Sequence, residues 1–209
     1  MSDWGISRKL FVGTGALVAL LLVSGVVAYE GSASIERQME SIIYRTVPKI
    51  DKAHQIKENS LAVRSEMRRA LLFAFAQQLD QVQESSKVID KLVSQTNQLI
   101  DDVAPLVVLP EARQAMADTK KALADWDQHE TEVERLAMAG KANDAWTYAK
   151  DKANPIIDNI DKLTGRFLEL QQQNLKTAET GATETYSQVT FTNVGLLTVS
   201  LLIAAAVFY

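Results

Sequence analysis

Cysteine is absent from this 209-residue chain, and proline and glycine are scarce, with four and nine residues. Without cysteine the chain has no disulfide, no thiolate nucleophile and no cysteine-bound zinc. The formal net charge is −4, and the sequence has no basic patch that would neutralise phosphates, so we expect no nucleic-acid partner. The scarcity of helix breakers favours long helices.

Charge-free apolar runs lie at both ends of the chain. The first, residues 10–29, is about 20 residues long, which as a helix is enough to cross the ~30 Å hydrocarbon layer of a bilayer. Arg8 and Lys9 precede it and place residues 1–9 in the cytoplasm under the positive-inside rule. A signal peptide cleaved after Ala28 is the alternative, but the apolar core of a signal peptide is usually shorter. We therefore expect an uncleaved transmembrane helix at 10–29.

The second apolar run occupies residues 193–209 and lacks the basic residues that usually follow a span on the cytoplasmic side. We expect it to be a second transmembrane helix that is cut short, with further chain after it. Residues 30–192 then form one sensor domain in the periplasm, tied to the bilayer at both ends. A polypeptide that leaves the membrane and re-enters it in this way is suited to passing a signal across it.

Helical periodicity dominates the segment between the two runs, and no stretch alternates as a strand does. The breakers divide it into four expected helices: 29–76, kinked at Pro48; 78–103; 110–140, begun by Pro110 and ended by Gly140; and one that starts at Asn143 or Asp144 and continues into the second run. Two long helices reach the membrane and two shorter ones do not. This arrangement predicts an all-α fold, an up-down-up-down four-helix bundle.

The expected fourth helix has a core-facing apolar seam only in its first half. The seam residues are Ile156, Ile160, Leu163, Phe167 and Leu170, and the seam continues with Asn174, Thr177, Gly181, Glu184 and Gln188. Two helices with a polar seam lack a core of their own, and a second copy of the chain would supply the missing partners. We therefore expect a homodimer.

Residues 10–209 resemble the N-terminal part of a bacterial methyl-accepting chemotaxis receptor with a four-helix-bundle ligand-binding domain. The matching features are the basic start and apolar anchor, Val47-Pro48, the arginine-containing stretch 63–70, the turn Ala139-Gly140-Lys141 leading to Ala145-Trp146, and Asn154-Pro155. The resemblance implies the bacterial inner membrane as the location. It also implies a downstream HAMP and signalling domain, not included in the 209 residues, that controls a kinase through an adaptor.

Receptors of this family for amino acids and small carboxylates bind their ligand with arginines on the first helix, in one branch at spacings of five and four. Arg64 and Arg69 reproduce the first spacing, whereas Phe73 stands at the third position. Helical-wheel positions place Arg64 and Arg68 beside the expected core-facing stripe and direct Arg69 elsewhere. That stripe consists of Ile56, Ser60, Val63, Met67, Ala70 and Ala74. A guanidinium takes a carboxylate by two hydrogen bonds, so we expect a carboxylate-type ligand at these arginines.

Residues at the height of Arg64 on the other expected helices are further candidates for this ligand site. They are Trp126, Tyr148, Asn154, Asp158 and Asn159. The alternative is that the arginines are surface residues whose stems lie on neighbouring helices and whose charges are paired by Glu66 and Asp158.

No catalytic dyad, phosphate-binding glycine loop or metal-ligand spacing occurs in the sequence, so we expect no enzyme activity, no cofactor and no bound metal. Glu130, Glu132 and Glu134 have the pattern of a solvated helix face. The main interpretation is the input module of a transmembrane chemoreceptor. The alternatives are the sensor domain of a membrane histidine kinase or diguanylate cyclase, and a ligand-free structural bundle anchored in the membrane.

Overall fold

The computed structural model describes the backbone of residues 6–208 and, within it, the side chains of residues 11–44 and 46–206. The elements are α1 (Ile6–Ser41), η1 (Ile42–Thr46), α2 (Val47–Phe75), α3 (Leu79–Val103), η2 (Ala104–Leu106), α4 (Pro110–Met138), α5 (Ala142–Tyr148), η3 (Ala149–Ala153) and α6 (Asn154–Phe208). No strand occurs in the described range, so the all-α class is confirmed. Most of the expected cytoplasmic segment 1–9 and the last residue of the expected second span, Tyr209, lie outside the described residues.

The helices form two compact units. The bundle unit, Tyr44–Asn174, contains α2, α3, α4, α5 and the first part of α6. The terminal unit consists of the segments before Tyr44 and after Asn174, so it contains α1 and the rest of α6.

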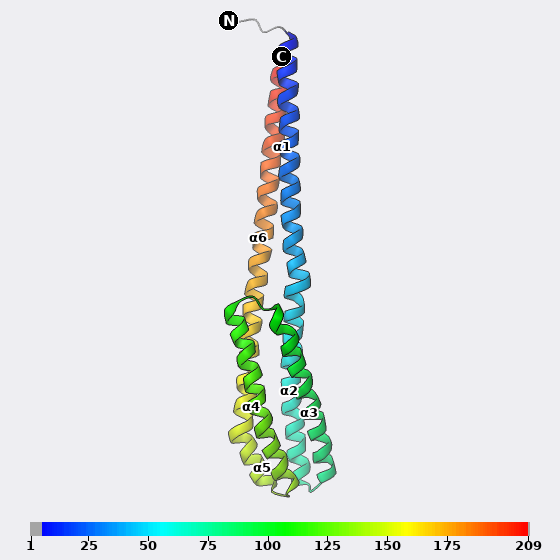
Figure 1. Cartoon of the computed structure of the whole chain (residues 1–209), viewed down its shortest axis with the longest axis vertical. Helices are drawn as coiled ribbons and strands as arrows, with labels where there is room; N and C mark the ends of the chain where they lie inside the picture. The colour runs from blue at the N-terminus through cyan, green and yellow to red at the C-terminus, as the bar shows by residue number, and fades with distance from the viewer. Residues whose placement is uncertain (1–5, 209) are drawn as a thin grey trace. The chain divides into compact units, whose positions relative to one another are not determined.

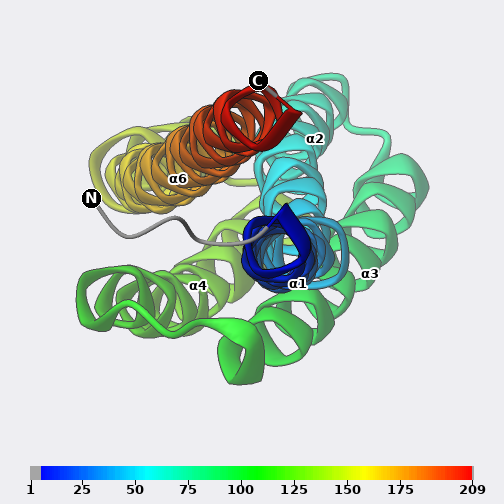
Figure 2. The same cartoon turned by 90° about the horizontal axis from the view of Figure 1, so that it is seen from above.

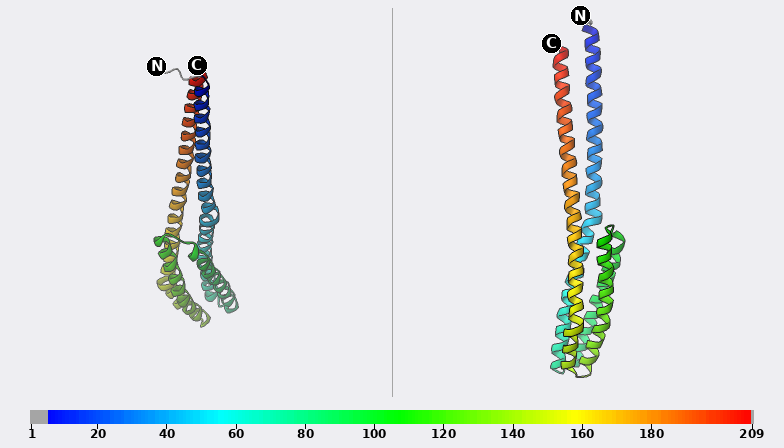
Figure 3. Two further views of the ribbon diagram at one scale, coloured as in Figure 1. Left: turned by 45° about the horizontal axis from the view of Figure 1, so that its top comes forward. Right: turned by 90° about the vertical axis from the view of Figure 1, so that its left-hand side faces the viewer.

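In the bundle unit, α2 and α3 form an antiparallel pair, and α4 packs against α3, α5 and η3 (Figure 1). The α2–α3 turn and the α4–α5 turn lie together at one end of this unit, and the connection through η2 lies at the other end (Figure 3). Figure 2 shows the same helices end-on. The expected up-down-up-down four-helix bundle is confirmed, with η3 and the start of α6 continuing from α5 as its last helix.

The core of the bundle unit follows the predicted face of α2 and departs by one residue on α6. The whole predicted α2 stripe, from Ile56 to Ala74, is buried. On α6, Ile160, Phe167 and Leu170 are buried as expected. Ile157 and Leu168 are also buried, whereas Ile156 and Leu163 are only partly covered. A helix in a bundle buries an arc wider than one seam, which explains the additional residues.

Each proline inside a long helix directly follows a π-helical turn: η1 precedes Val47-Pro48, and η3 precedes Asn154-Pro155. Proline has no N–H, and its ring crowds the carbonyl four residues earlier. That carbonyl belongs to Tyr44 in the first case and to Asp151 in the second, and both lie within the π turns. The wider turn accommodates the crowded carbonyl, so helix continues without interruption over Phe11–Phe75 and over Ala142–Ala206.

The glycine that was expected to end the third helix does so. Gly140 has φ of +72°, and the backbone N–H groups of Gly140 and Lys141 donate to the carbonyls of Ala137 and Leu136, both at 3.0 Å. These two bonds define a Schellman motif. The prediction that Asn143 or Asp144 caps the next helix is wrong, because α5 begins directly after this motif at Ala142.

In the terminal unit, α1 and the last part of α6 run side by side (Figure 1). Gly31 is buried there, and a Cβ on it would overlap Cγ2 of Val189, so the helices approach too closely for a larger residue. Ser24 Oγ donates a hydrogen bond to Oδ1 of Asn193 at 2.7 Å. A glycine and a polar pair therefore take part in this contact.

The predicted polar seam of α6 is displaced in the terminal unit. Thr177, Glu184 and Gln188 are exposed. Gly181 of the predicted seam is half-buried, and the other half-buried residues of α6 in this unit are Leu175, Ala178, Ala182, Thr185, Val189, Asn193, Leu196, Ser200, Ile203 and Ala204. Within this set, Ala178, Val189 and Ser200 follow an eleven-residue repeat. The prediction assumed a seven-residue repeat, and positions spaced by seven residues move gradually away from the covered face of the helix.

Large apolar side chains in both terminal runs face outward. Phe11, Leu22, Leu201 and Leu202 are among the most exposed of them. By length and composition, the helices containing these runs are candidates for membrane spans.

Candidate functional site

The arginines that the sequence singles out on α2 lie in different surroundings. Arg64 faces α6, where its Nη2 donates to Oδ1 of Asp158 at 2.7 Å and to Oδ2 of Asp161 at 3.0 Å. Arg68 is exposed. Arg69 is exposed too, and its Nη1 lies 3.1 Å from Oε1 of Glu66, one turn earlier on the same helix. Of the predicted site residues, the structure thus brings Arg64 and Asp158 into direct contact.

Asp161 extends this contact to the core of the bundle unit. Ser60, which is buried, donates from Oγ to Oδ1 of Asp161 at 2.8 Å. We call Ser60, Arg64, Asp158 and Asp161 the α2–α6 clasp. The side chains of Arg64 and Asp161 are 23% and 24% exposed. Two carboxylates against one guanidinium leave a formal charge of −1, so a carboxylate ligand would have to displace an aspartate to reach Arg64.

The remaining predicted residues are spread over the bundle unit. Trp126 is fully buried, and its Nε1 has no hydrogen-bond partner among the described residues. Tyr148 Oη lies 2.9 Å from Nδ1 of His129, which joins the end of α5 to α4. Asn154 is half-buried at the start of α6, and Asn159 is exposed. Trp126 and Tyr148 therefore have evident packing roles, and Asn159 points to solvent.

Arg69 lines a groove, although the helical wheel directed it away from the other arginines. The groove has a volume of about 200 Å³ and lies between α2 and α3, with Glu66, Arg69 and Phe73 on one side and Gln81, Glu84, Ser85 and Val88 on the other. Phe73 occupies the third position of the family's arginine spacing. Here it is partly buried and packs against the core.

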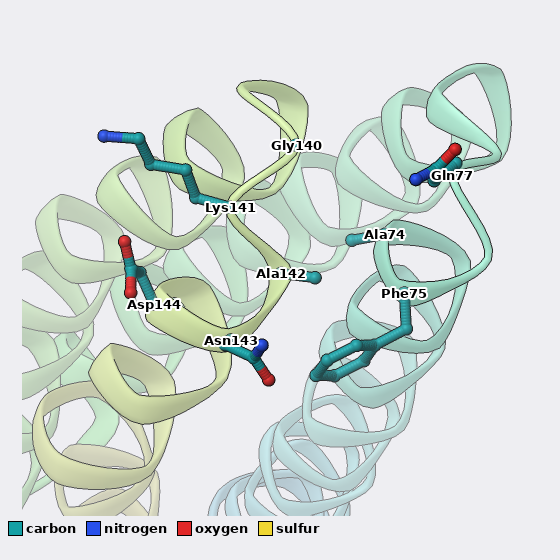
Figure 4. A pocket seen from close by; sticks show the side chains of 8 residues that line it. All are labelled: Ala74, Phe75, Gln77, Gly140, Lys141, Ala142, Asn143 and Asp144. Carbon is teal, nitrogen blue, oxygen red and sulfur yellow. The ribbon is translucent and has the colours of Figure 1, made fainter.

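A second cleft, of about 320 Å³, lies between the two turns at one end of the bundle unit (Figure 4). The ring of Phe75 and the amides of Gln77 and Asn143 point into it, whereas the side chains of Lys141 and Asp144 extend away from it. Phe75 also packs against Trp146, with ring centroids 6.5 Å apart. Both aromatic residues remain about half exposed.

Glu130 on α4 is a buried carboxyl group. Its burial, together with the nearby negative charges of Glu134, Asp90 and Asp127, raises the pKa of Glu130 to about 8 from an ordinary value of 4.5. The expectation that Glu130 belongs to a solvated face is therefore wrong. Its spacing from Trp126 and Val133 puts it on the buried stripe of α4, and this spacing could have identified it.

Sequence reasoning missed three further groups of these sites. Asp161 was not considered, although it lies one turn after Asp158 and so faces the same neighbour. Ser60 was placed in the core, where it is, without its bond to Asp161. Glu66 was considered only as a counter-ion. Its largely covered position beside a groove depends on packing between α2 and α3 that no local pattern encodes.

The comparisons with known proteins agree with this geometry. No curated protein gives a significant match to the chain. A family model described as a four helix bundle sensory module for signal transduction matches residues 3–186, which is most of the chain. The chain therefore belongs to the family of four-helix-bundle sensory modules of methyl-accepting chemotaxis proteins.

Proposed function

We propose that the chain is the input module of a transmembrane chemoreceptor that senses a small periplasmic ligand. Residues 30–192 lie in the periplasm, the runs 10–29 and 193–209 span the inner membrane, and residues 1–9 are cytoplasmic. The family is a sensory one, and two helices are long and apolar enough to cross a bilayer, which supports this topology.

The α2–α6 clasp is the observation that carries the proposal. It joins two helices of the bundle unit, and α6 itself continues to Phe208 through the second apolar run. An organic acid or amino acid that competes with Asp158 and Asp161 for Arg64 opens the clasp and favours a second packing of α6. The ligand moves this equilibrium only as far as its affinities for the two states differ.

The output is a shift of α6 by roughly 1–2 Å, a size that is typical of helix movements in allosteric proteins. A cytoplasmic signalling domain receives the shift and controls chemotaxis through a kinase and an adaptor. The working unit is a homodimer. In support of this, Leu61, Leu72 and Phe75 are exposed on α2 and could pack against a second copy of the chain.

A fusion of residues 1–209 to the signalling domain of a characterised chemoreceptor tests the proposal. Kinase activity in membrane vesicles is measured against a panel of organic acids and amino acids. We expect at least one compound to change it, and we expect the double variant Asp158→Asn with Asp161→Asn to shift the activity without ligand. Lys57→Ala, which removes an exposed charge from α2, is the matched control. No response to any compound, with equal activity for the clasp variant and the control, would favour the ligand-free structural bundle.

The topology is tested by cysteine labelling, because the chain has no cysteine of its own. Gln128→Cys places a thiol at an exposed position of α4, and a maleimide that cannot cross membranes should label it in intact cells whose outer membrane is permeable. Ser2→Cys is the control and should be labelled only after lysis. The reverse pattern would overturn the periplasmic placement.

A further inference from the structure

Glu66, which lines the groove between α2 and α3, has one carboxylate oxygen without a hydrogen-bond partner among the described residues. Only 14% of the Glu66 side chain is exposed, and its Oε1 pairs with Nη1 of Arg69. Its Oε2 is buried and has no partner among the described residues. Buried acceptors without donors are rare in folded proteins because an unmade hydrogen bond is costly. This oxygen of Glu66 is therefore free to accept a hydrogen bond from a further donor.

The other polar groups of the groove add further acceptors. Ser85 is buried and Gln81 is exposed, and the hydroxyl and the amide of these two residues can each accept as well as donate, whereas Glu84 adds a second carboxylate at the exposed edge. Glu84 lies 3.4 Å from Lys87, but both side chains are well exposed, so this pair binds weakly. With Arg69 as the single cation, the charged residues that line the groove have a formal charge of −1.

A primary ammonium group matches this set of acceptors. It carries one positive charge and three N–H donors and has no acceptor. The ring of Phe73 lines the same groove, and aromatic faces attract ammonium groups. A carboxylate alone fits poorly, because Glu66 and Glu84 would repel it.

We propose that the groove between α2 and α3 binds the primary ammonium group of a small ligand, with Glu66 and Ser85 as acceptors and Phe73 as the apolar wall. Plain amines and amino acids both carry this ammonium group. Arg69 is exposed and retains N–H donors for the carboxylate that an amino acid also carries. The proposal rests on the sensory function proposed above and adds to it a second recognition site, for the ammonium group of an amine or amino acid. It differs from the carboxylate site predicted at Arg64, where the guanidinium is already paired with two aspartates.

Calorimetric titration of the full chain in lipid nanodiscs tests the ligand class with three probes of similar size. 2-Aminoethanol has the ammonium group without a carboxylate, serine has both groups, and glycerate has the carboxylate without the ammonium. We expect 2-aminoethanol and serine to bind and glycerate not to bind. Tighter binding of serine than of 2-aminoethanol would assign a carboxylate contact to Arg69. Glycerate binding as well as serine, or binding by none of the probes, overturns the proposal.

Two variants locate the binding. Glu66→Gln keeps the shape of the side chain but removes its charge, and we expect binding of 2-aminoethanol to weaken by about tenfold to a hundredfold. Glu58→Gln removes the same charge from an exposed position on the same helix, and its affinity should equal that of the wild type. Circular dichroism of each variant checks that the helices are intact. Unchanged affinity in Glu66→Gln overturns the assignment of the site.

The failure of this proposal can be told apart from failure of the sensory function. If the fused receptor responds to other compounds while Glu66→Gln leaves every response unchanged, the groove is not the sensing site and the sensory function stands. If 2-aminoethanol binds at Glu66 but never changes kinase activity, the groove is a binding site and sensing through it fails.

Discussion

The two units of the chain use apolar side chains in opposite ways. In the bundle unit, apolar residues form the core, and Trp126 and Phe167 are fully buried, although Phe75 and Trp146 remain about half exposed. In the terminal unit, Phe11 and Phe191 are both 82% exposed. Between α1 and α6 there, Gly31 approaches Val189, and Ser24 donates a hydrogen bond to Asn193.

Under the topology proposed above, the bundle unit lies in water and the apolar runs of the terminal unit lie in the bilayer. Burial of apolar surface stabilises a bundle in water. In a bilayer the surrounding lipid is as apolar as leucine, so helices associate through close packing of small residues and through hydrogen bonds between helices. A run of apolar residues therefore indicates core positions in the bundle unit and outward-facing positions in the terminal unit.

Replacing one phenylalanine in each unit is the strongest test of this comparison. Phe167→Ala should lower the free energy of unfolding of the bundle unit by about 3–5 kcal/mol, because it removes a large buried ring and leaves a cavity. Phe191→Ala, on the same helix, should leave it unchanged. Denaturation of the full chain in nanodiscs, followed by tryptophan fluorescence, measures both. A similar loss for the two variants would contradict the opposite roles of the two units.

The buried carboxyl of Glu130 should make the stability of the bundle unit depend on pH. Its folded pKa of about 8 lies above the ordinary 4.5, so the folded state holds one more proton than the unfolded state between these values. The stabilisation from this group is complete below about pH 4.5 and is lost as the pH rises through 8.

Glu130→Gln should remove this dependence, and at pH 8 the variant should be more stable than the wild type by about 2–3 kcal/mol. Unfolding curves of both proteins between pH 5 and 9 provide the measurement. Glu134→Gln, a half-buried position one turn away, is the control and should retain most of the slope. Parallel pH profiles of wild type and Glu130→Gln would mean that the carboxyl is solvated.

The α2–α6 clasp should contribute to the stability of the bundle unit, although it is polar. Arg64→Ala leaves Asp158 and Asp161 without their cation, and we expect a loss of about 1–3 kcal/mol, at the lower end because the groups are partly exposed. Arg68→Ala, at an exposed position one turn later, should change stability by less than about 0.5 kcal/mol. Equal effects would show that Arg64 is an ordinary surface arginine.

Most of the fold could be predicted from the sequence, because few residues interrupt its helical pattern. Pro110 and Gly140 mark the two ends of α4 to within two residues. The seam of α6 beyond Asn174 could not be placed, because a seven-residue and an eleven-residue repeat are both compatible with the composition there, and only the packed partner selects one.

The candidate sites were predicted less completely. Helix lengths placed Asp158 at the height of Arg64, and the structure shows the contact. The spacing of Glu130 from Trp126 and Val133 on α4 marks it as a buried position, although the sequence analysis did not use this signal. No such pattern identifies Glu66, because its low exposure depends on how α3 packs beside α2 in the assembled bundle.

The close approach in the terminal unit should depend on one glycine. Gly31→Ala places a Cβ against Val189 and should weaken the contact between α1 and α6 by about 1–2 kcal/mol. Gly15→Ala, where nothing lies within 4 Å of the added atom, is the control. The cysteine pair Ser24→Cys with Asn193→Cys reports the contact through its rate of disulfide formation. An unchanged rate in Gly31→Ala would show that this contact does not need a small residue.

The smallest expected change in the free energy of unfolding comes from the turns of the bundle unit. There the backbone conformation, and not burial from solvent, determines which residue is favoured. Gln77 repeats the Schellman geometry of Gly140: the N–H groups of Gln77 and Gln78 donate to the carbonyls of Ala74 and Phe73 at 3.1 and 2.9 Å. Gln77 has φ of +58°, a left-handed conformation that is strained for a residue with a Cβ.

Gln77→Gly should therefore raise the free energy of unfolding by about 0.5–1 kcal/mol, because the relief of strain exceeds the added entropy of the unfolded chain. Gly140→Ala should lower it by about 1 kcal/mol, since alanine would take on the strain that Gln77 already has. Both are measured by thermal unfolding of the full chain in nanodiscs. Because the two positions share one geometry, changes of the same sign would show that contacts of the side chains, and not φ, decide the stability of these turns.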